Sequence, residues 1–264
     1  MGDAVEVVAA MPPASVNCVV TSPPYWGLRD YRVAGQYGAE STVDGYVSRL
    51  VGLFDKLRRV LSRDGTAWLN LGDCFGGSWG NYVADGSVAR TASARAATGY
   101  GVHRPPQSAR RSKDLVGVPW RVAHSLQQRG WILRNAVVWE KPNARPESVR
   151  DRLAQRYELV FLLTQSETHW LSSEVWSADG MTDLWTVPAG RSRTGHPAAG
   201  TLEIARRCVR LGCRRGGVVL DPFCGSGTTG LAALEYGCSF IGIDLDPACR
   251  DLAHRRLAEF VEAV

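Results

Sequence analysis

The sequence predicts an α/β protein built on a mostly parallel sheet with helices on both faces. Two observations predict this class. Short β-branched segments that stop at glycine or proline alternate with longer segments whose apolar residues recur at helical spacing. The C-terminal part of the chain reads strand, glycine-rich turn, helix, strand, helix, which is typical of parallel strands joined by covering helices. The 264 residues, 45% of them hydrophobic, are enough to bury a large core.

The expected elements of the first part of the chain follow from local patterns. Residues 16–21 form a buried strand, because a β-branched run stops at two prolines that cannot donate to a sheet. A helix is expected over 41–61, where apolar residues recur every three or four positions and Ser41 or Thr42 can cap the start. Residues 65–73 then form a turn, a strand and a loop.

The middle of the chain contains a long segment without periodicity, followed by a helix and two strands. Residues 75–112 are rich in Gly, Ser, Ala and Arg without periodicity, which predicts a long basic loop. A helix with Pro119 in its first turn and Gly130 at its end comes next, because proline suits the first helical turn and glycine the C-terminus. Strands are expected over 131–143 and 158–165.

The last part contains the clearest unit. Residues 166–194 are irregular and dotted with tryptophan, and a helix follows at about 201–211. The stretch "GGVVLDPFCGSGTTGLAALEYGCSFIGIDLDPACRDLAHRRL" then predicts two strands and two helices, the second helix capped by Asp246 with Pro247 in its first turn. The chain shows no internal repeat.

Composition excludes several classes of protein. No run approaches the ~20 apolar residues of a membrane span, and no basic segment followed by an apolar one opens the chain as a secretion signal would. The seven cysteines contain no C-x-x-C pair, so we expect neither a disulfide framework nor a metal site. The formal net charge is +5, and basic residues concentrate between Asp85 and Asp114 and over 191–215. This distribution favours a polyanionic partner.

The glycine-rich turn predicts a nucleotide-like cofactor. Gly225, Gly227 and Gly230 match G-x-G-x-x-G between a strand and a helix, and glycines let the backbone approach a ligand. Asp244 ends the next strand, at the place of a carboxylate that binds ribose hydroxyls. The glycines alone favour NAD. The Asp-Pro pair at 221–222 instead favours a ligand with a cationic amino group, such as S-adenosylmethionine.

The motifs together resemble the beta class of DNA amino-methyltransferases. The stretch "VVLDPFCGSGTTGLAALEYGCSFIGIDLDP" resembles their cofactor motif, and "TSPPYWGLRDY" resembles their catalytic motif. "LNLGD", "GVPWRVA", "GWILRNAVVWEKPN" and "PESVRDR" are also similar. The resemblance implies a Rossmann-like, S-adenosylmethionine-dependent methyltransferase fold with the catalytic motif first. It implies a single domain over 1–264, in which 75–112 and 166–194 are the candidate DNA-recognition segments.

The catalytic motif is interpreted as a rigid clamp for an exocyclic amine of a flipped-out base. The lone pair of such an amine is delocalised into the ring, and an acceptor for each N–H helps the nitrogen become a nucleophile. A backbone carbonyl within 22–24 and the Ser22 side chain are the two expected acceptors. Pro23 and Pro24 hold the carbonyls in place. Tyr25 is expected to stack on the base.

The resemblance also implies the target and the cofactor-binding residues. In the family, serine at the first position of the catalytic motif leans towards N4 of cytosine, whereas Asp or Asn leans towards N6 of adenine. Methylation at C5 of cytosine uses a cysteine beside a proline, and no Pro-Cys pair occurs here. The expected cofactor-binding residues are Asp3, Thr21, Asp221, Pro222, Phe223, Gly225, Ser226, Gly227, Thr228, Thr229, Asp244, Leu245 and His196.

Double-stranded DNA is the expected partner. Arginine and lysine give phosphate contacts, and arginine also pairs with guanine. The residues expected to bind DNA are Arg104, Arg110, Arg111, Lys113, Arg191 and Arg193. A cognate restriction endonuclease is an open second partner, and the family implies a bacterial or phage-encoded protein of the cytoplasm.

Three alternatives stay open. The first is an N6-adenine methyltransferase of the same fold. The second is an RNA or protein amide methyltransferase, although the related motif of those enzymes usually follows the cofactor motif. The third is a DNA-binding relative with impaired cofactor binding, because Gly200-Thr201 stands where family members carry Phe-Pro and little sequence precedes Asp3.

Overall fold

The computed structural model describes residues 2–29, 31, 33–76, 113–144, 150–179, 182–190 and 201–262, with the side chains of 178 and 179 left out. Most of the predicted loop over 75–112 therefore lies outside the described residues, as do 191–194 at the end of the predicted insert. Among the described residues, no helix is both long enough and apolar enough to cross a membrane.

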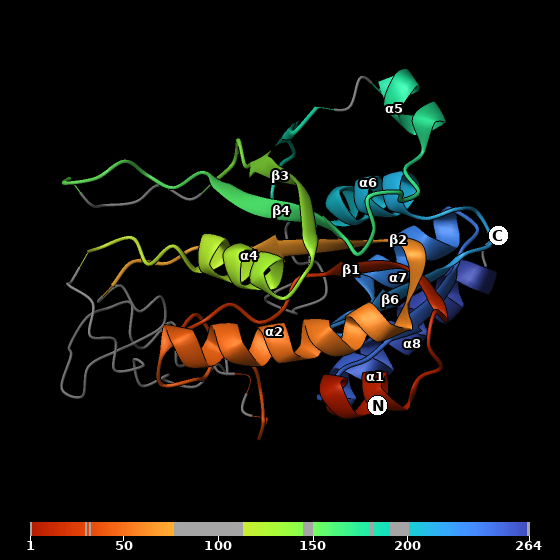
Figure 1. The fold of residues 1–264 in the computed structure, drawn as a ribbon, viewed down its shortest axis with the longest axis horizontal. Coiled ribbons are helices and arrows are strands. Elements are labelled where there is room, and N and C mark those ends of the chain that lie inside the picture. Colours follow the sequence, from red (N-terminus) through yellow and green to blue (C-terminus); the bar gives the residue numbers. More distant parts are fainter. Residues whose placement is uncertain are drawn as a thin grey trace.

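The described strands form one seven-stranded sheet in the order β5-β3-β4-β2-β1-β6-β7 (Figure 1). β4 runs antiparallel to β2 and β3, and the other neighbouring pairs are parallel. The strands are β1 (Val16–Thr21), β2 (Leu61–Leu71), β3 (Ile132–Glu140), β4 (Tyr157–Thr164), β5 (Leu184–Thr186), β6 (Val218–Asp221) and β7 (Ser239–Gly242). The predicted α/β class with a mostly parallel sheet is confirmed.

Helices cover both faces of this sheet, as predicted. α1, α2 and α4 pack on one face in a large apolar cluster, and α6 and α7 contribute to a second cluster on the other. α8 packs beside α7. The helices are α1 (Ala4–Ala10), α2 (Val43–Val60), α4 (Val118–Gln128), α5 (Ser173–Asp179), α6 (Leu202–Gly212), α7 (Thr228–Glu235) and α8 (Pro247–Glu262).

Local signals account for the helix boundaries. The Thr42 hydroxyl accepts a hydrogen bond from the Gly45 N–H at 3.0 Å and so caps α2. Pro119 stands in the first turn of α4. Gly130 follows that helix with a φ of 88°, in the left-handed region that glycine adopts without strain. Asp246 accepts from the Ala248 N–H at 2.9 Å at the start of α8.

The prediction that 166–194 is irregular is wrong for part of its described residues. α5 and β5 lie within it, and β5 pairs in parallel with β3. Trp185 of β5 is 2% exposed and stacks on Trp68, with ring centroids 6.1 Å apart. A three-residue strand gives no periodicity to detect, so only its buried tryptophan could have revealed it.

The contact between α6 and β2 predicts a steric test of the fold. A Cβ added at Gly212 would lie 2.2 Å from Trp68 Nε1 and 2.4 Å from Thr66 Oγ1. We therefore expect Gly212→Ala to lower the free energy of unfolding by about 1–3 kcal/mol, measured by urea denaturation. Gly52 of α2 is the matched control, because a Cβ there meets nothing within 4 Å. Gly52→Ala should raise stability by up to about 1 kcal/mol.

Candidate active site

Three cavities meet at the carboxyl end of β1, and Ser22 lines all three. Ser22 directly follows this strand, and β1 lies between β2 and β6. The chain leaves β1 towards β2 by way of α2, whereas β6 joins on the other side. In open α/β sheets ligands bind at such a reversal of strand order, outside the carboxyl ends of the strands. The topology therefore places Ser22 where a ligand site is expected.

The first cavity combines aromatic rings with carboxylates. Tyr37 and Phe223 line it with ring centroids 4.9 Å apart in an edge-to-face arrangement. Asp3 and Asp244 line it as well. Three more of the predicted cofactor-binding residues line the same cavity: Pro222, Gly225 and Leu245. Flat apolar walls beside carboxylates suit a purine nucleoside, whose base stacks and whose hydroxyls donate.

Two carboxylates of this cavity also organise the backbone around it. Asp244 accepts from the Gly225 N–H at 2.8 Å and from the Asp246 N–H at 2.9 Å, so it fixes the glycine-rich turn. Asp3 accepts from the Val5 N–H at 2.8 Å and caps α1. The Glu6 N–H also donates to the same oxygen of Asp3, at 3.4 Å, so the hydrogen bonds at the start of α1 use only Oδ1. The two carboxylates thus hold the start of α1 and the glycine-rich turn at the edge of this cavity.

The second cavity contains a buried acid. Asp221, 4% exposed, accepts hydrogen bonds from the Thr21 and Thr229 hydroxyls at 2.7 Å each and from the Phe223 N–H at 3.0 Å. Burial raises the pKa of Asp221 to about 6, although these three hydrogen bonds oppose the shift. The predicted residues Ser226 and Thr228 line the same cavity.

The later glycines of the motif serve packing in the structure. Gly227 has a φ of 78°, and a Cβ there would lie 3.0 Å from the Ala253 Cβ of α8. A Cβ at Gly230 would lie 2.7 Å from the Phe240 ring. Neither residue lines any of the three cavities. Their geometry is what close packing of α7 against its neighbours requires.

The third cavity is built around the turn Ser22–Tyr25. The Tyr46 hydroxyl donates to the Pro24 carbonyl at 3.0 Å from the face of α2. Ser22 itself is exposed. Ser22 thus lines this cavity from an exposed position, while Tyr46 holds the Pro24 carbonyl in place.

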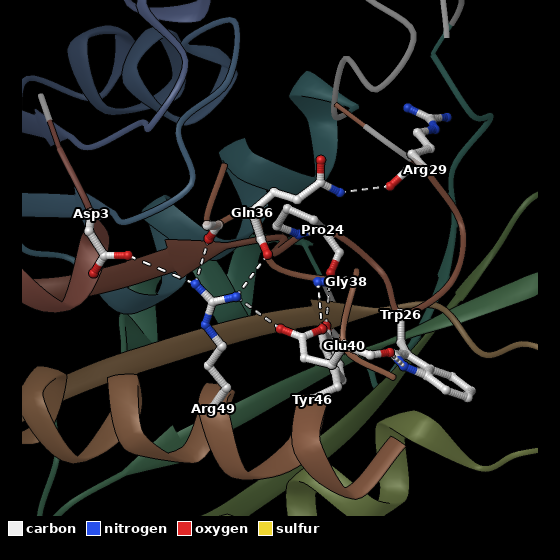
Figure 2. A network of polar contacts seen from close by, with 10 residues as sticks. Asp3, Pro24, Trp26, Arg29, Gln36, Gly38, Glu40, Tyr46 and Arg49 are labelled. Atoms are coloured by element: carbon white, nitrogen blue, oxygen red, sulfur yellow. Dashed lines mark hydrogen bonds and ion pairs between the residues drawn. The ribbon is translucent and has the colours of Figure 1, made fainter. Parts of the chain in front are cut away.

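Arg49 of α2 joins the turn region to the first cavity (Figure 2). Its guanidinium donates to the Gln36 carbonyl at 2.8 Å and to Glu40 at 3.1 Å, and it stacks on the Tyr37 ring at 3.9 Å. It also lies 4.0 Å from the Asp3 carboxylate. One arginine thus fixes the wall formed by residues 35–40.

A polar cluster surrounds the hydroxyl end of Tyr25. The Tyr25 hydroxyl donates to Glu158 at 2.6 Å, and the Asn70 amide donates to the same carboxylate at 3.0 Å. Lys141 forms an ion pair with the other oxygen of Glu158. A Cβ at Gly72 would lie 2.6 Å from the Tyr25 ring, so the ring packs directly on the backbone there. These contacts fix the plane of the ring.

The residues predicted to bind DNA lie mostly outside the described part of the chain, as does His196. Arg104, Arg110, Arg111, Arg191 and Arg193 all fall there. Lys113 is exposed and pairs with Asp151, away from the three cavities. Several arginines of the second basic region form ion pairs within the chain: Arg206 with Glu235, Arg207 with Glu203, and Arg214 with Asp64. Since their charges are compensated within the chain, these three arginines are weaker candidates for DNA contacts than the sequence predicts.

Sequence reasoning missed five side chains that shape the site. They are Tyr46, Arg49, Asn70, Lys141 and Glu158. Asn70 interrupts the apolar run of β2, and a polar residue in a buried strand is a usable signal. Glu158 precedes the apolar run of β4, and Lys141 follows β3, so neither gives that signal. Tyr46 and Arg49 gave no such signal, because they sit in a helix whose pattern predicts packing and a solvated face.

The chain matches a family model and curated sequences. Residues 16–255 match the N6/N4 methyltransferase model, described as DNA methylase. The chain is 40% identical to the type II methyltransferase M.Cfr9I of Citrobacter freundii, over 97% of this chain and 86% of the relative. It is 41% identical to the type II methyltransferase M.SmaI of Serratia marcescens, over 97% and 89%.

Solved structures share the fold. The chain resembles the PvuII DNA methyltransferase, described as cytosine-N4-specific, with a TM-score of 0.70 at 18% identity, covering 98% of this chain and 91% of that one. It resembles TTHA0409 of Thermus thermophilus, in complex with S-adenosyl-L-methionine, with a TM-score of 0.67 at 24% identity, covering 98% and 92%.

Proposed function

This chain belongs to the N6/N4 DNA methylase family, and from that membership we propose that it transfers a methyl group from S-adenosylmethionine to N4 of a cytosine in a specific DNA sequence. The observation that carries the proposal is Ser22, which lines the cavity suited to a nucleoside and also the cavity built around the catalytic turn. A methyl donor and an acceptor amine would meet there.

The cofactor is assigned to the first two cavities. The Tyr37 and Phe223 rings suit the adenine, and Asp3 and Asp244 suit the hydroxyls of the adenosine. Asp221 in the second cavity suits the cationic amino group of the methionine part. When bound, S-adenosylmethionine supplies an electrophilic methyl group on a sulfonium. Gly227 would affect the cofactor only indirectly, by letting α7 pack closely against Ala253 of α8.

The catalytic turn would prepare the target amine. The Ser22 hydroxyl and a backbone carbonyl of the turn would each accept one N–H of the amine. We assign the Pro23 carbonyl to this role, because the Pro24 carbonyl already accepts from the Tyr46 hydroxyl. Localising the nitrogen lone pair in this way would make N4 a nucleophile. As the N–C bond formed, the bond from the methyl carbon to the sulfonium would break and release the neutral thioether. The amine would then lose one proton along its hydrogen bond to Ser22, which is exposed and passes the proton to solvent. Tyr25 would stack on the base after it leaves the duplex.

Cytosine is proposed over adenine because the first motif residue is Ser22 and not a carboxylate or an amide. A hydroxyl is a weaker acceptor than a carboxylate, which fits the family's leaning of serine towards N4 of cytosine. The type II relatives support a role in restriction-modification. A restriction endonuclease with the same recognition sequence is therefore the second partner that we propose.

The DNA would be held by Lys113 together with the five arginines predicted from the sequence. Affinity that rests on phosphate contacts falls steeply as salt rises. The segments 75–112 and 166–194 remain the proposed source of sequence preference, because they lie outside the motifs that the family shares.

Nucleoside mass spectrometry tests the proposal. The protein is incubated with S-adenosylmethionine and unmethylated genomic DNA, and the DNA is digested to nucleosides. We expect N4-methylcytosine as the product. N6-methyladenine would keep the fold and the clamp but overturn the choice of base. Absence of any methylated base, with no cofactor binding by calorimetry, would favour a DNA-binding relative that has lost activity.

A further inference from the structure

The third cavity contains a cation that the proposed mechanism does not use. Lys141 directly follows β3 and lines the same cavity as Ser22, Pro23 and Tyr25. Its side chain is 18% exposed, and its ammonium lies 4.4 Å from the centroid of the Trp139 ring, which lines the same cavity. Burying a lysine is costly unless its charge is compensated and its donors are used.

The charge of Lys141 is compensated within the chain. Glu158 forms an ion pair with it through Oε1, while Oε2 accepts from Tyr25 and Asn70. An ammonium carries three N–H donors, and Glu158 is the one hydrogen-bond acceptor that the described residues provide for it. A neutralised ammonium with donors that no described residue occupies suits an uncharged acceptor better than a phosphate.

A base held by the proposed clamp presents such an acceptor. Next to the amine of cytosine come ring nitrogen N3 and then the carbonyl O2, all on one edge. Next to the amine of adenine come N1 and then a carbon-bound hydrogen. A donor aimed at the third position therefore finds an acceptor in cytosine and none in adenine. A site built to hydrogen-bond one substrate rejects the other, because its buried donor is left unpaired.

We propose that Lys141 is a specificity-determining residue that donates a hydrogen bond to the O2 carbonyl of the target cytosine. The inference rests on the proposed N4-cytosine function. Glu158 is a positioning residue in this arrangement, because one carboxylate holds both Lys141 and the hydroxyl of Tyr25. Glu158 can reach Lys141 because β3 and β4 are antiparallel neighbours in which Glu158 lies opposite Trp139. Trp139 precedes Lys141 by two residues along the chain.

The experiment compares two target bases in one sequence. The recognition sequence is first read from the methylated positions of genomic DNA. Duplexes then carry either cytosine or adenine at the target position, and single-turnover methylation is measured for each. Lys141→Met should lower the rate on cytosine by about 10- to 100-fold and change the rate on adenine by less than about threefold. Lys141→Arg, which keeps the charge and donors, should recover most of the rate on cytosine.

The controls separate recognition from damage to the fold. Lys56→Met removes an exposed lysine of α2 and should leave both rates unchanged. If Lys141→Met does not fold, Lys141→Gln, whose amide is too short to reach the same point, should show the same loss of discrimination. Equal loss on both bases, or no loss on cytosine, would overturn the inference. Failure of the proposed function is distinct, because the wild-type protein would then make no N4-methylcytosine.

Discussion

Tyr25→Ala should lower turnover by about 10- to 100-fold and leave the affinity for S-adenosylmethionine within about twofold. The expected loss is the stacking of a flipped base on an aromatic ring, which is worth about 1–3 kcal/mol per base. The ring lines the third cavity and is absent from the first two. Cofactor binding should therefore not sense the change. Steady-state methylation rates and calorimetric titration with the cofactor check the two halves.

Tyr25→Phe is the matched variant for this prediction. It keeps the ring but removes the hydroxyl that donates to Glu158 at 2.6 Å and accepts from Asn70 at 2.9 Å. We expect a smaller loss, of about 10-fold or less, because the hydrogen bond only orients the ring. Full activity of Tyr25→Ala would show that the ring has no part in holding the base.

Asp221→Asn should weaken S-adenosylmethionine binding by about 10- to 100-fold at about pH 8, because the carboxylate loses its charge towards a cationic amino group. The wild-type affinity should fall as pH drops below about 6, where Asp221 becomes protonated. The affinity of the Asn variant should lack this component. Asp55→Asn is the control, because Asp55 pairs with Arg129 at the surface. Calorimetry at several pH values makes the comparison.

Asp221→Asn weakens cofactor binding but should make the folded protein more stable than the wild type at neutral pH. The folded-state pKa of Asp221, about 6, lies above the ordinary value of 3.8. The contribution of this group to stability is therefore full below about pH 4 and is lost as pH rises through about 6. Relative to Asp221→Asn, the wild-type protein should lose up to about 3 kcal/mol between about pH 4 and about pH 7. Urea denaturation of both proteins across this pH range measures the difference. For the binding prediction, an Asp221→Asn variant that binds S-adenosylmethionine like the wild type would contradict the role assigned to Asp221.

Patterns of local origin predicted most of the fold. The strand over 16–21, the Thr42 cap and the unit that contains β6, α7, β7 and α8 follow from neighbours in sequence, which is what periodicity and turn chemistry report. β4, which runs antiparallel to β2 and β3, was predicted as a strand but not in its direction. The burial pattern of a single strand does not show whether the strand runs parallel or antiparallel to its neighbours in the sheet.

The candidate site was predicted where its residues belong to motifs and missed where they do not. Ser22, Asp221 and Asp244 stand at or just after strand ends, and the sequence shows where strands end. Tyr46 and Glu158 act from a helix and a strand far along the chain, and their contacts with the turn Ser22–Tyr25 exist only after the sheet has formed. A single sequence does not report such pairings.

The shared position of Ser22 has a practical consequence for chemists. Because one residue borders all three cavities, a single small molecule could occupy two of them. An adenosine joined by a short linker to an aminopyrimidine would bind its second half intramolecularly once the first half is seated. Such a linkage raises affinity by about 10²- to 10⁴-fold over either half alone when the linker matches the span. The junction at Ser22 is therefore the place from which to design an inhibitor.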